Sequence, residues 1–133
     1  MLVLRKKVLL VDDEESLCRI IKLNLEETGR YKVQTESKGV NVLPAILDFK
    51  PDIVVLDFIM PDMDGADILK QIEGNPKTKN IPIIFLTAVA TKEDTQDQGA
   101  MIGGHFVLAK PVTLESLTEA IDRKLNEKGL FFK

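Results

Sequence analysis

Polar side chains able to do chemistry follow four of the apolar segments in this chain of 133 residues. They are Asp12, Asp13, Asp57, Thr87 and Lys110. Three carboxylates held together repel one another and stay ionised only when a cation compensates, and hard oxygen ligands favour Mg²⁺. A carboxylate can also act as a nucleophile and form an aspartyl-phosphate. Because phosphoryl transfer needs mainly alignment and charge neutralisation, these residue types together favour phosphoryl chemistry with Mg²⁺.

The segments that must position these residues alternate between strands and helices. Apolar or alternating runs predict five strands, at residues 8–11, 31–35, 53–56, 83–86 and 106–108. Apolar residues at helical spacing predict helices within 17–25, 40–47, 68–72 and 114–125, and the polar stretch 91–101 is assigned to a further helix. Runs that are apolar at every position are typical of strands buried on both faces. The pattern therefore predicts an α/β fold, a five-stranded parallel sheet with helices on both faces.

This architecture would bring the polar residues to one place. The carboxyl ends of parallel strands meet at the same sheet edge, where ligands bind. Taken alone, each residue has an ordinary structural explanation: Asp13 or Ser16 could cap the first helix, and Thr87 could simply end a strand. Four of five strand ends carry the groups that one reaction needs, and this joint pattern favours a functional site.

Two residues carry expectations about helix starts. Pro44 lacks a backbone donor and crowds the preceding turn, which predicts a late start or a kink in the second helix. Thr113 is the predicted N-cap of the last helix, with Glu115 in its first turn.

Composition narrows the functional classes. Hydrophobic residues make up 44% and charged residues 29%, which is typical of a globular domain. The net charge of -3 argues against direct nucleic-acid binding through bulk electrostatics. Cys18 is the only cysteine, which excludes an internal disulfide framework and favours a reducing compartment. No apolar run approaches the roughly 18 residues of a membrane span, and no secretion signal is recognisable, so we expect a cytoplasmic, single-domain protein over residues 1–133.

Four motifs in fixed order carry a more specific signal. They are Val8–Glu14, Pro51–Gly65, Ile83–Ala88 and Lys110–Pro111. With them the chain resembles the receiver domain of bacterial two-component response regulators over about residues 5–128, leaving 129–133 as a tail or the start of a linker. The resemblance implies a flavodoxin-like, doubly wound sheet of strand order 2-1-3-4-5 with five flanking helices.

The resemblance also implies roles for individual residues. Asp57 would be the phosphoacceptor, and Asp12, Asp13 and Asp57 would hold Mg²⁺ together with the backbone carbonyl of Ile59. Lys110 would contact the phosphoryl group. The phosphate would come from a sensor histidine kinase or a phosphotransfer protein, and the chain would catalyse only its own phosphorylation and dephosphorylation. The Lys110–Pro111 bond is expected to be cis, as in many family members.

One departure from the family pattern concerns the switch. Thr87 would hydrogen-bond a phosphoryl oxygen and report phosphorylation, coupled to an aromatic residue three positions before the lysine. That position is Val107, and Phe106 lies one residue earlier. Either a one-residue bulge brings Phe106 into the switch position or no aromatic switch exists, since a shift of one residue reverses the facing side in a strand.

Other functional classes remain as alternatives. A haloacid-dehalogenase-like phosphatase would need a second acid two residues after the nucleophile, where this chain has Ile59. A phosphorylation-independent binding module is expected to have lost some of the site residues, and all are present. Nucleotide binding would need a glycine fingerprint that is missing. The length leaves no room for an output domain, so the chain either docks an unknown downstream protein, with homodimerisation also open, or belongs to a longer protein.

Overall fold

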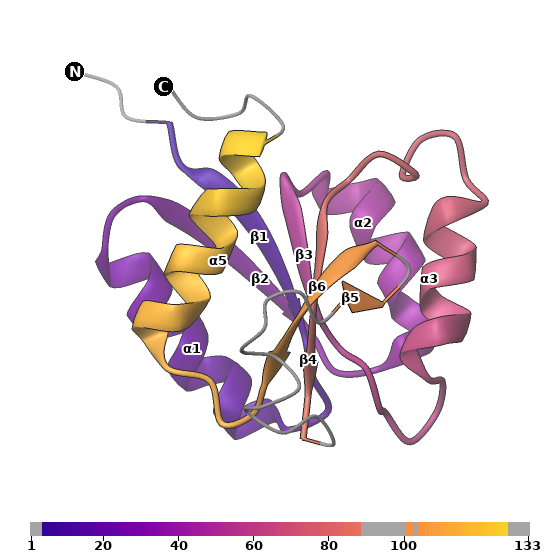
Figure 1. Ribbon diagram of the computed structural model, residues 1–133, viewed down its shortest axis with the longest axis horizontal. Coiled ribbons are helices and arrows are strands. Elements are labelled where there is room, and N and C mark those ends of the chain that lie inside the picture. Colours follow the sequence, from indigo (N-terminus) through magenta and orange to yellow (C-terminus); the bar gives the residue numbers. More distant parts are fainter. Residues whose placement is uncertain (1–3, 89–100, 103, 128–133) are drawn as a thin grey trace.

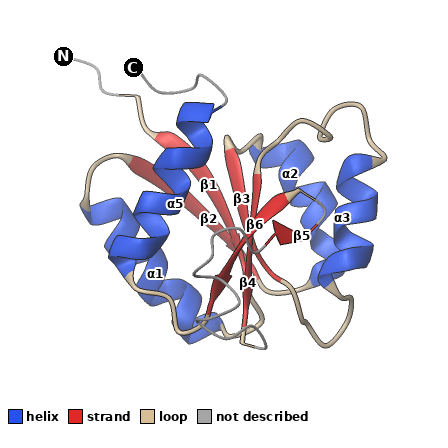
Figure 2. Ribbon diagram, viewed as in Figure 1, coloured by secondary structure: helices blue, strands red, loops and turns tan. Residues whose placement is uncertain are grey.

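A central twisted sheet with helices on both faces forms the molecule (Figure 1, Figure 2). The computed structural model describes residues 4–88, 101–102 and 104–127. Five strands are parallel and lie in the spatial order β2-β1-β3-β4-β6. They are β1 (Lys6–Val11), β2 (Tyr31–Glu36), β3 (Ile53–Asp57), β4 (Ile83–Thr87) and β6 (His105–Ala109). The predicted parallel sheet of order 2-1-3-4-5 is confirmed, with β6 as its fifth strand.

A sixth strand was not predicted. β5 (Met101–Ile102) pairs antiparallel with β6 through Met101–Phe106 and Ile102–His105, and so adds a short edge to the sheet. The helix predicted over residues 91–101 is wrong at Met101, and the rest of that segment lies outside the described residues. Two residues are too few for a period-two pattern, so the sequence carries no signal for this strand.

Among the described residues, α-helices cover both faces of the sheet, two on each (Figure 1). α1 (Glu15–Glu27) and α5 (Leu114–Glu127) pack on one face, and α2 (Val42–Phe49) and α3 (Gly65–Glu73) on the other. Successive strand side chains point to opposite faces. Val8 and Leu10 accordingly join the core under α1 and α5, whereas Leu9 and Val11 join the core under α2 and α3. Because each such side chain contributes about 1.5–3 kcal/mol when buried, both faces must be apolar, which explains the unbroken apolar runs.

The helix starts agree with the two local predictions. A 3₁₀ turn, η1 (Gly39–Asn41), precedes α2, which begins at Val42 and so places Pro44 in its first turn, where a missing backbone donor costs little. Thr113 caps α5, because its Oγ1 accepts a hydrogen bond from the Ser116 N–H at 3.0 Å. No helix among the described residues combines the length and apolar character needed to cross a membrane.

Gly65 lets the loop after β3 turn tightly into α3. Its N–H donates to the Phe58 carbonyl at 2.6 Å, and a Cβ placed on Gly65 would lie 2.6 Å from Phe58 Cδ1 and 2.9 Å from the Phe58 carbonyl oxygen. The Phe58 ring is itself held edge-on against Phe85, with ring centroids 5.3 Å apart. A side chain at this position therefore requires the backbone to move.

Gly65→Ala is expected to lower the free energy of unfolding by about 1–3 kcal/mol, the usual cost of overpacking. Urea denaturation followed by circular dichroism measures the change. Gly74→Ala provides the comparison, because a Cβ on Gly74 would approach nothing closer than 3.0 Å. Equal effects of the two substitutions would contradict the assignment of Gly65 to a close-approach position.

Candidate functional site

The predicted site residues meet at the carboxyl edge of the sheet. Asp12 directly follows β1, Asp57 is the last residue of β3 and Thr87 the last residue of β4, while Lys110 follows β6. Parallel pairing sets these ends side by side, since Val11 pairs with Leu56, Asp57 with Leu86, and Thr87 with Ala109. Residues up to 98 positions apart, from Asp12 to Lys110, thus share one site.

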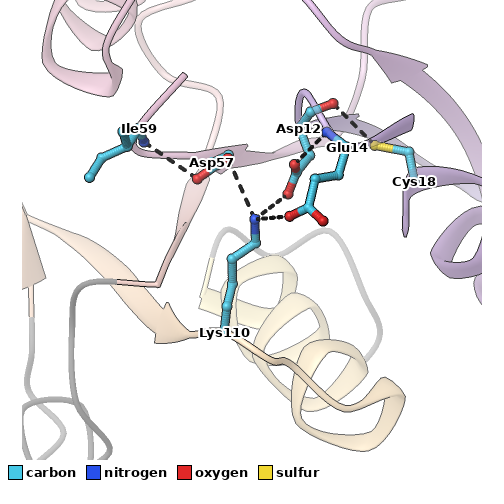
Figure 3. A network of polar contacts seen from close by, with 6 residues as sticks. All are labelled: Asp12, Glu14, Cys18, Asp57, Ile59 and Lys110. Atoms are coloured by element: carbon cyan, nitrogen blue, oxygen red, sulfur yellow. Dashed lines mark hydrogen bonds and ion pairs between the residues drawn. The ribbon is translucent and has the colours of Figure 1, made fainter. Parts of the chain in front are cut away.

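Lys110 is the cation at the centre of the site (Figure 3). Its Nζ lies 2.7 Å from Asp12 Oδ2, 3.5 Å from Asp57 Oδ2 and 3.5 Å from Glu14 Oε1. Burial by itself lowers the pKa of Lys110, but the close contact with the Asp12 carboxylate, with further help from the charges of Asp57 and Glu14, outweighs burial and raises it. Lys110 therefore stays charged and contacts the carboxylates of Asp12, Glu14 and Asp57.

Asp12 is held in place by the start of α1. Its side chain is only 1% exposed, its Oδ1 accepts the Glu14 N–H at 3.0 Å, and its backbone carbonyl accepts the Cys18 thiol at 3.4 Å. Oδ2 meets Lys110 at ion-pair distance but without hydrogen-bond alignment, so within the described part of the chain this buried oxygen has no well-directed donor. A buried carboxylate oxygen in this state is costly unless a further cation approaches it.

The negative charge of Asp57 is only partly compensated by its surroundings. Its side chain is 7% exposed and its Oδ1 accepts the Ile59 N–H at a long 3.4 Å. Burial, with the charge of Asp12 as the second cause, raises the pKa of Asp57 to about 6 even though Lys110 opposes the shift. The single positive charge of Lys110 is thus too little to balance the buried carboxylates of the site.

The residues present fit a hard divalent cation. Asp12, Asp13 and Asp57 each offer a carboxylate oxygen, and these oxygens lie within 4.8 Å of one another. Asp12 and Asp57 are buried whereas Asp13 is exposed, so the cluster opens to solvent on the Asp13 side. Carboxylate oxygens plus water are the ligand set that Mg²⁺ prefers. The poorly matched Asp12 Oδ2 and the raised pKa of Asp57 agree with a site completed by such an ion.

Thr87 and Lys110 are linked through the backbone at this edge. The Lys110 N–H donates to the Thr87 carbonyl at 2.9 Å, and Thr87 is buried with 5% of its surface exposed. The Lys110–Pro111 peptide bond is cis, as expected. The end of β4 and the turn after β6 are therefore joined next to Asp57.

Phe106 and Val107 lie on opposite faces of the sheet. Pairing between β4 and β6 runs without a bulge, from Ile84–Phe106 through Phe85–Val107 to Thr87–Ala109. Val107 is 7% exposed in the core under α2 and α3. The Phe106 ring lies under α5 instead, with Lys124 Nζ 4.8 Å from its centroid. The hypothesis that a bulge brings Phe106 into the switch position is wrong, because the register of β6 against β4 is unbroken.

Two acidic residues near the site were not predicted as part of it. Glu14 directly precedes α1, and its Oε1 lies 3.5 Å from Lys110 Nζ. Asp62, in the loop after β3, accepts the N–H groups of Gly39 at 3.0 Å and Val40 at 3.1 Å and so ties that loop to η1. These hydrogen bonds are also what lowers the pKa of Asp62. Neither contact leaves a local sequence signal, because each joins segments far apart in the chain.

Fold and site together define a signalling domain of the phosphorelay class. Residues 8–122 match the response regulator receiver domain, and the chain belongs to this family and serves phosphorelay signal transduction. It is 34% identical over 117 residues to the chemotaxis protein CheY-3 of Vibrio cholerae, covering 88% of this chain and 89% of that protein. The chemotaxis protein CheY of Pseudomonas aeruginosa is 32% identical over 117 residues, covering 88% of this chain and 94% of that protein.

A solved structure supports the same assignment. The chemotaxis response regulator CheY4 of Vibrio cholerae superposes with a TM-score of 0.77 at 30% identity and covers 92% of this chain and all of that chain. As a receiver domain, the protein is a signalling module with an acidic pocket for Mg²⁺, and it acts between a histidine kinase and a downstream protein.

Proposed function

We propose that Asp57 is the phosphoacceptor of this receiver and that Asp12, Asp13 and Asp57 bind Mg²⁺ with the Ile59 carbonyl. The observation that carries the proposal is the placement of Asp57, a buried carboxylate at a strand end that faces Lys110 and two further carboxylates. In the transfer, an Asp57 oxygen forms a bond to phosphorus while the P–N bond of the donor phosphohistidine breaks and the imidazole retains the electron pair. Mg²⁺, when bound, supplies charge neutralisation for the phosphoryl oxygens.

Lys110 and Thr87 act on the transferred group in this proposal. Lys110 has three donors on a charged nitrogen, and a phosphoryl group on Asp57 would draw it from Asp12, its nearest present partner at 2.7 Å. The Thr87 hydroxyl, at the end of the neighbouring strand, would donate to a phosphoryl oxygen. Movement of these two side chains is the proposed response to phosphorylation.

Intact mass spectrometry tests the metal requirement. With Mg²⁺ and acetyl phosphate, the chain is expected to gain one phosphoryl group, and excess EDTA is expected to prevent the gain. The same sample is tested for steady release of phosphate from unrelated phosphate esters. Sustained ester hydrolysis would favour the phosphatase alternative, which Ile59 already argues against because it places an apolar side chain, 55% exposed, two residues after Asp57.

The face between α1 and α5 is the proposed docking surface for the phosphodonor protein. Ile20 is 58% exposed and Leu114 39% exposed, and both line a groove between these helices together with Leu17 and Leu117. Leu114 follows Lys110 by only four residues, so the groove continues from the edge that carries Asp57. Exposed apolar side chains beside a reaction site are typical of protein contact surfaces.

Ile20→Glu is expected to slow phosphoryl transfer from a histidine-phosphorylated kinase about tenfold, because it charges the centre of this groove. Labelling by acetyl phosphate is expected to stay unchanged, since a small donor needs no docking surface. Leu47→Glu, at an exposed apolar position on α2 away from the groove, serves as the control. Equal slowing with both donors, or none with the kinase, would contradict the docking assignment.

Signal transmission is proposed to proceed without an aromatic switch. On phosphorylation, the methyl NMR signals of Val107 are expected to shift, because Val107 lies on β6 beside the strand that ends at Thr87. The ring signals of Phe106 are expected to change little, since the ring is held under α5 by Lys124. A large change at Phe106 with none at Val107 would contradict this prediction.

The proposal also covers the cellular location, the domain bounds and the partners of the protein. Exchange with a kinase or phosphotransfer protein places the domain in the cytoplasm. The family match over residues 8–122 supports a single receiver domain within residues 1–133, with its core at about 5–128. A downstream protein, or a second copy in a homodimer, would read the phosphorylated state.

A further inference from the structure

A hollow lies at the amino ends of the strands, opposite the end of the sheet that carries Asp57. It has a volume of about 600 Å³ and lies between the end of α2 and the loop that leads from α3 to β4. Pro51 precedes β3 and Ile81 precedes β4, so the hollow is at the amino ends of the strands whose other ends carry Asp57 and Thr87. Its volume falls in the range of small-molecule sites.

The floor of this hollow is apolar. Ile46 is 1% exposed, Ile81 belongs to the partly buried residues packed on the core, and Leu47 is 38% exposed at the side. Thr78 is also buried, and its hydroxyl already donates to the Ile72 carbonyl at 2.7 Å. The surface offered to a ligand is therefore mainly hydrocarbon, suited to an aliphatic or aromatic body.

The rim carries two positive charges. Lys50 and Lys77 line the hollow from its two sides, one at the end of α2 and the other in the loop after α3. Both are exposed, and within the described part of the chain neither forms an ion pair with a carboxylate. Other lysines do find partners, as Lys7 does with the Phe49 carbonyl at 2.7 Å. Two ammonium groups without a carboxylate partner among the described residues, beside an apolar floor, match a ligand that has both a negative charge and a hydrocarbon part.

We propose that this hollow, lined by Ile46, Leu47, Pro51, Ile81, Lys50 and Lys77, binds a small amphipathic carboxylate. The hydrocarbon body lies on the apolar floor and the carboxylate lies between the two ammonium groups. The site does not depend on the chemistry at Asp57. An Asp57→Asn variant is accordingly expected to bind the same ligand with unchanged affinity, which separates this proposal from the proposed phosphoryl transfer.

Octanoate is the probe, followed by ¹H–¹⁵N NMR on the full chain. Saturable shifts are expected at the amides of Leu47 and Thr78. Acetate, which has the charge without the body, is expected to cause no saturable shift. Octanamide, which has the body without the charge, is expected to bind at least threefold more weakly. Absent octanoate shifts, shifts confined to other surfaces, or equal binding of octanamide would each overturn the proposal.

Variants test the two halves of the site. Lys50→Gln combined with Lys77→Gln is expected to weaken octanoate binding at least threefold, in line with two solvent-exposed charge contacts. Lys32→Gln combined with Lys70→Gln removes the same charge elsewhere on the surface and is expected to leave affinity unchanged. Leu47→Asn tests the apolar wall and is also expected to weaken binding. Lys50 has φ of 54°, which glutamine shares without added strain, and urea midpoints check that each variant is folded. Unchanged affinity in the first double variant, or equal loss in the second, would overturn the proposal.

Discussion

Asp57→Asn is expected to abolish phosphorylation by acetyl phosphate in the presence of Mg²⁺. The amide keeps the shape of the carboxylate but is a poor nucleophile, and the change removes the charge of one of the three carboxylates whose oxygens lie within 4.8 Å of one another. Intact mass spectrometry should show one added phosphoryl group on the wild-type chain and none on the variant. We expect an all-or-none effect because the proposal assigns acceptance of the phosphoryl group to Asp57 alone and assigns Asp12 and Asp13 to the metal ion.

A second aspartate variant controls for general effects of removing an acid. Asp48 is exposed on α2, away from the sheet edge that carries the site. Asp48→Asn should accept phosphate as the wild type does. Equal labelling of Asp57→Asn and the wild-type chain would refute Asp57 as the acceptor. An unlabelled wild type would refute acceptance of phosphate altogether.

The same substitution is expected to stabilise the metal-free protein. Ionised Asp57 is buried beside Asp12, and these two effects outweigh the attraction of Lys110, which is why its pKa rises to about 6. A neutral amide escapes this penalty, while Lys110 keeps its shorter contact with Asp12 at 2.7 Å. Asp57→Asn should therefore raise the free energy of unfolding at neutral pH by about 1–3 kcal/mol, since each pKa unit corresponds to about 1.4 kcal/mol.

Mg²⁺ should narrow or reverse the difference in the free energy of unfolding between Asp57→Asn and the wild-type chain. A ligand that binds only the folded state stabilises it by about 2.7 kcal/mol at one hundred times its dissociation constant. The wild-type chain has the full set of carboxylates and should gain more than the variant. Urea denaturation in EDTA and in Mg²⁺ measures the free energy of unfolding of both proteins without and with the ion, and Asp48→Asn is the control. A variant less stable than the wild type in EDTA would contradict the electrostatic account of the site.

Most of the architecture is predictable from local patterns. Strand side chains alternate between the two faces, and both faces are covered by helices, so a buried strand must be apolar at every position. Val8–Val11 and Ile53–Leu56 show this directly, and each run is followed by an aspartate. The carboxyl-edge rule then places Asp12 and Asp57 together without knowledge of any distance. The late start of the helix that contains Pro44 and the cap at Thr113 were predictable for the same reason, since capping and proline effects act within one turn.

Only the tertiary structure decides what depends on distant segments. Lys110 lies nearer to Asp12 than to Asp57, and it also contacts Glu14, which is 96 residues away in the chain. Phe106 faces α5 because β6 pairs with β4 in unbroken register, whereas the sequence left a bulge open. The short strand β5 and the lysine-rimmed hollow arise from packing between segments that share no pattern. Hydrophobic periodicity records which face of an element is buried, but register and long-range charge contacts are set only when the elements meet.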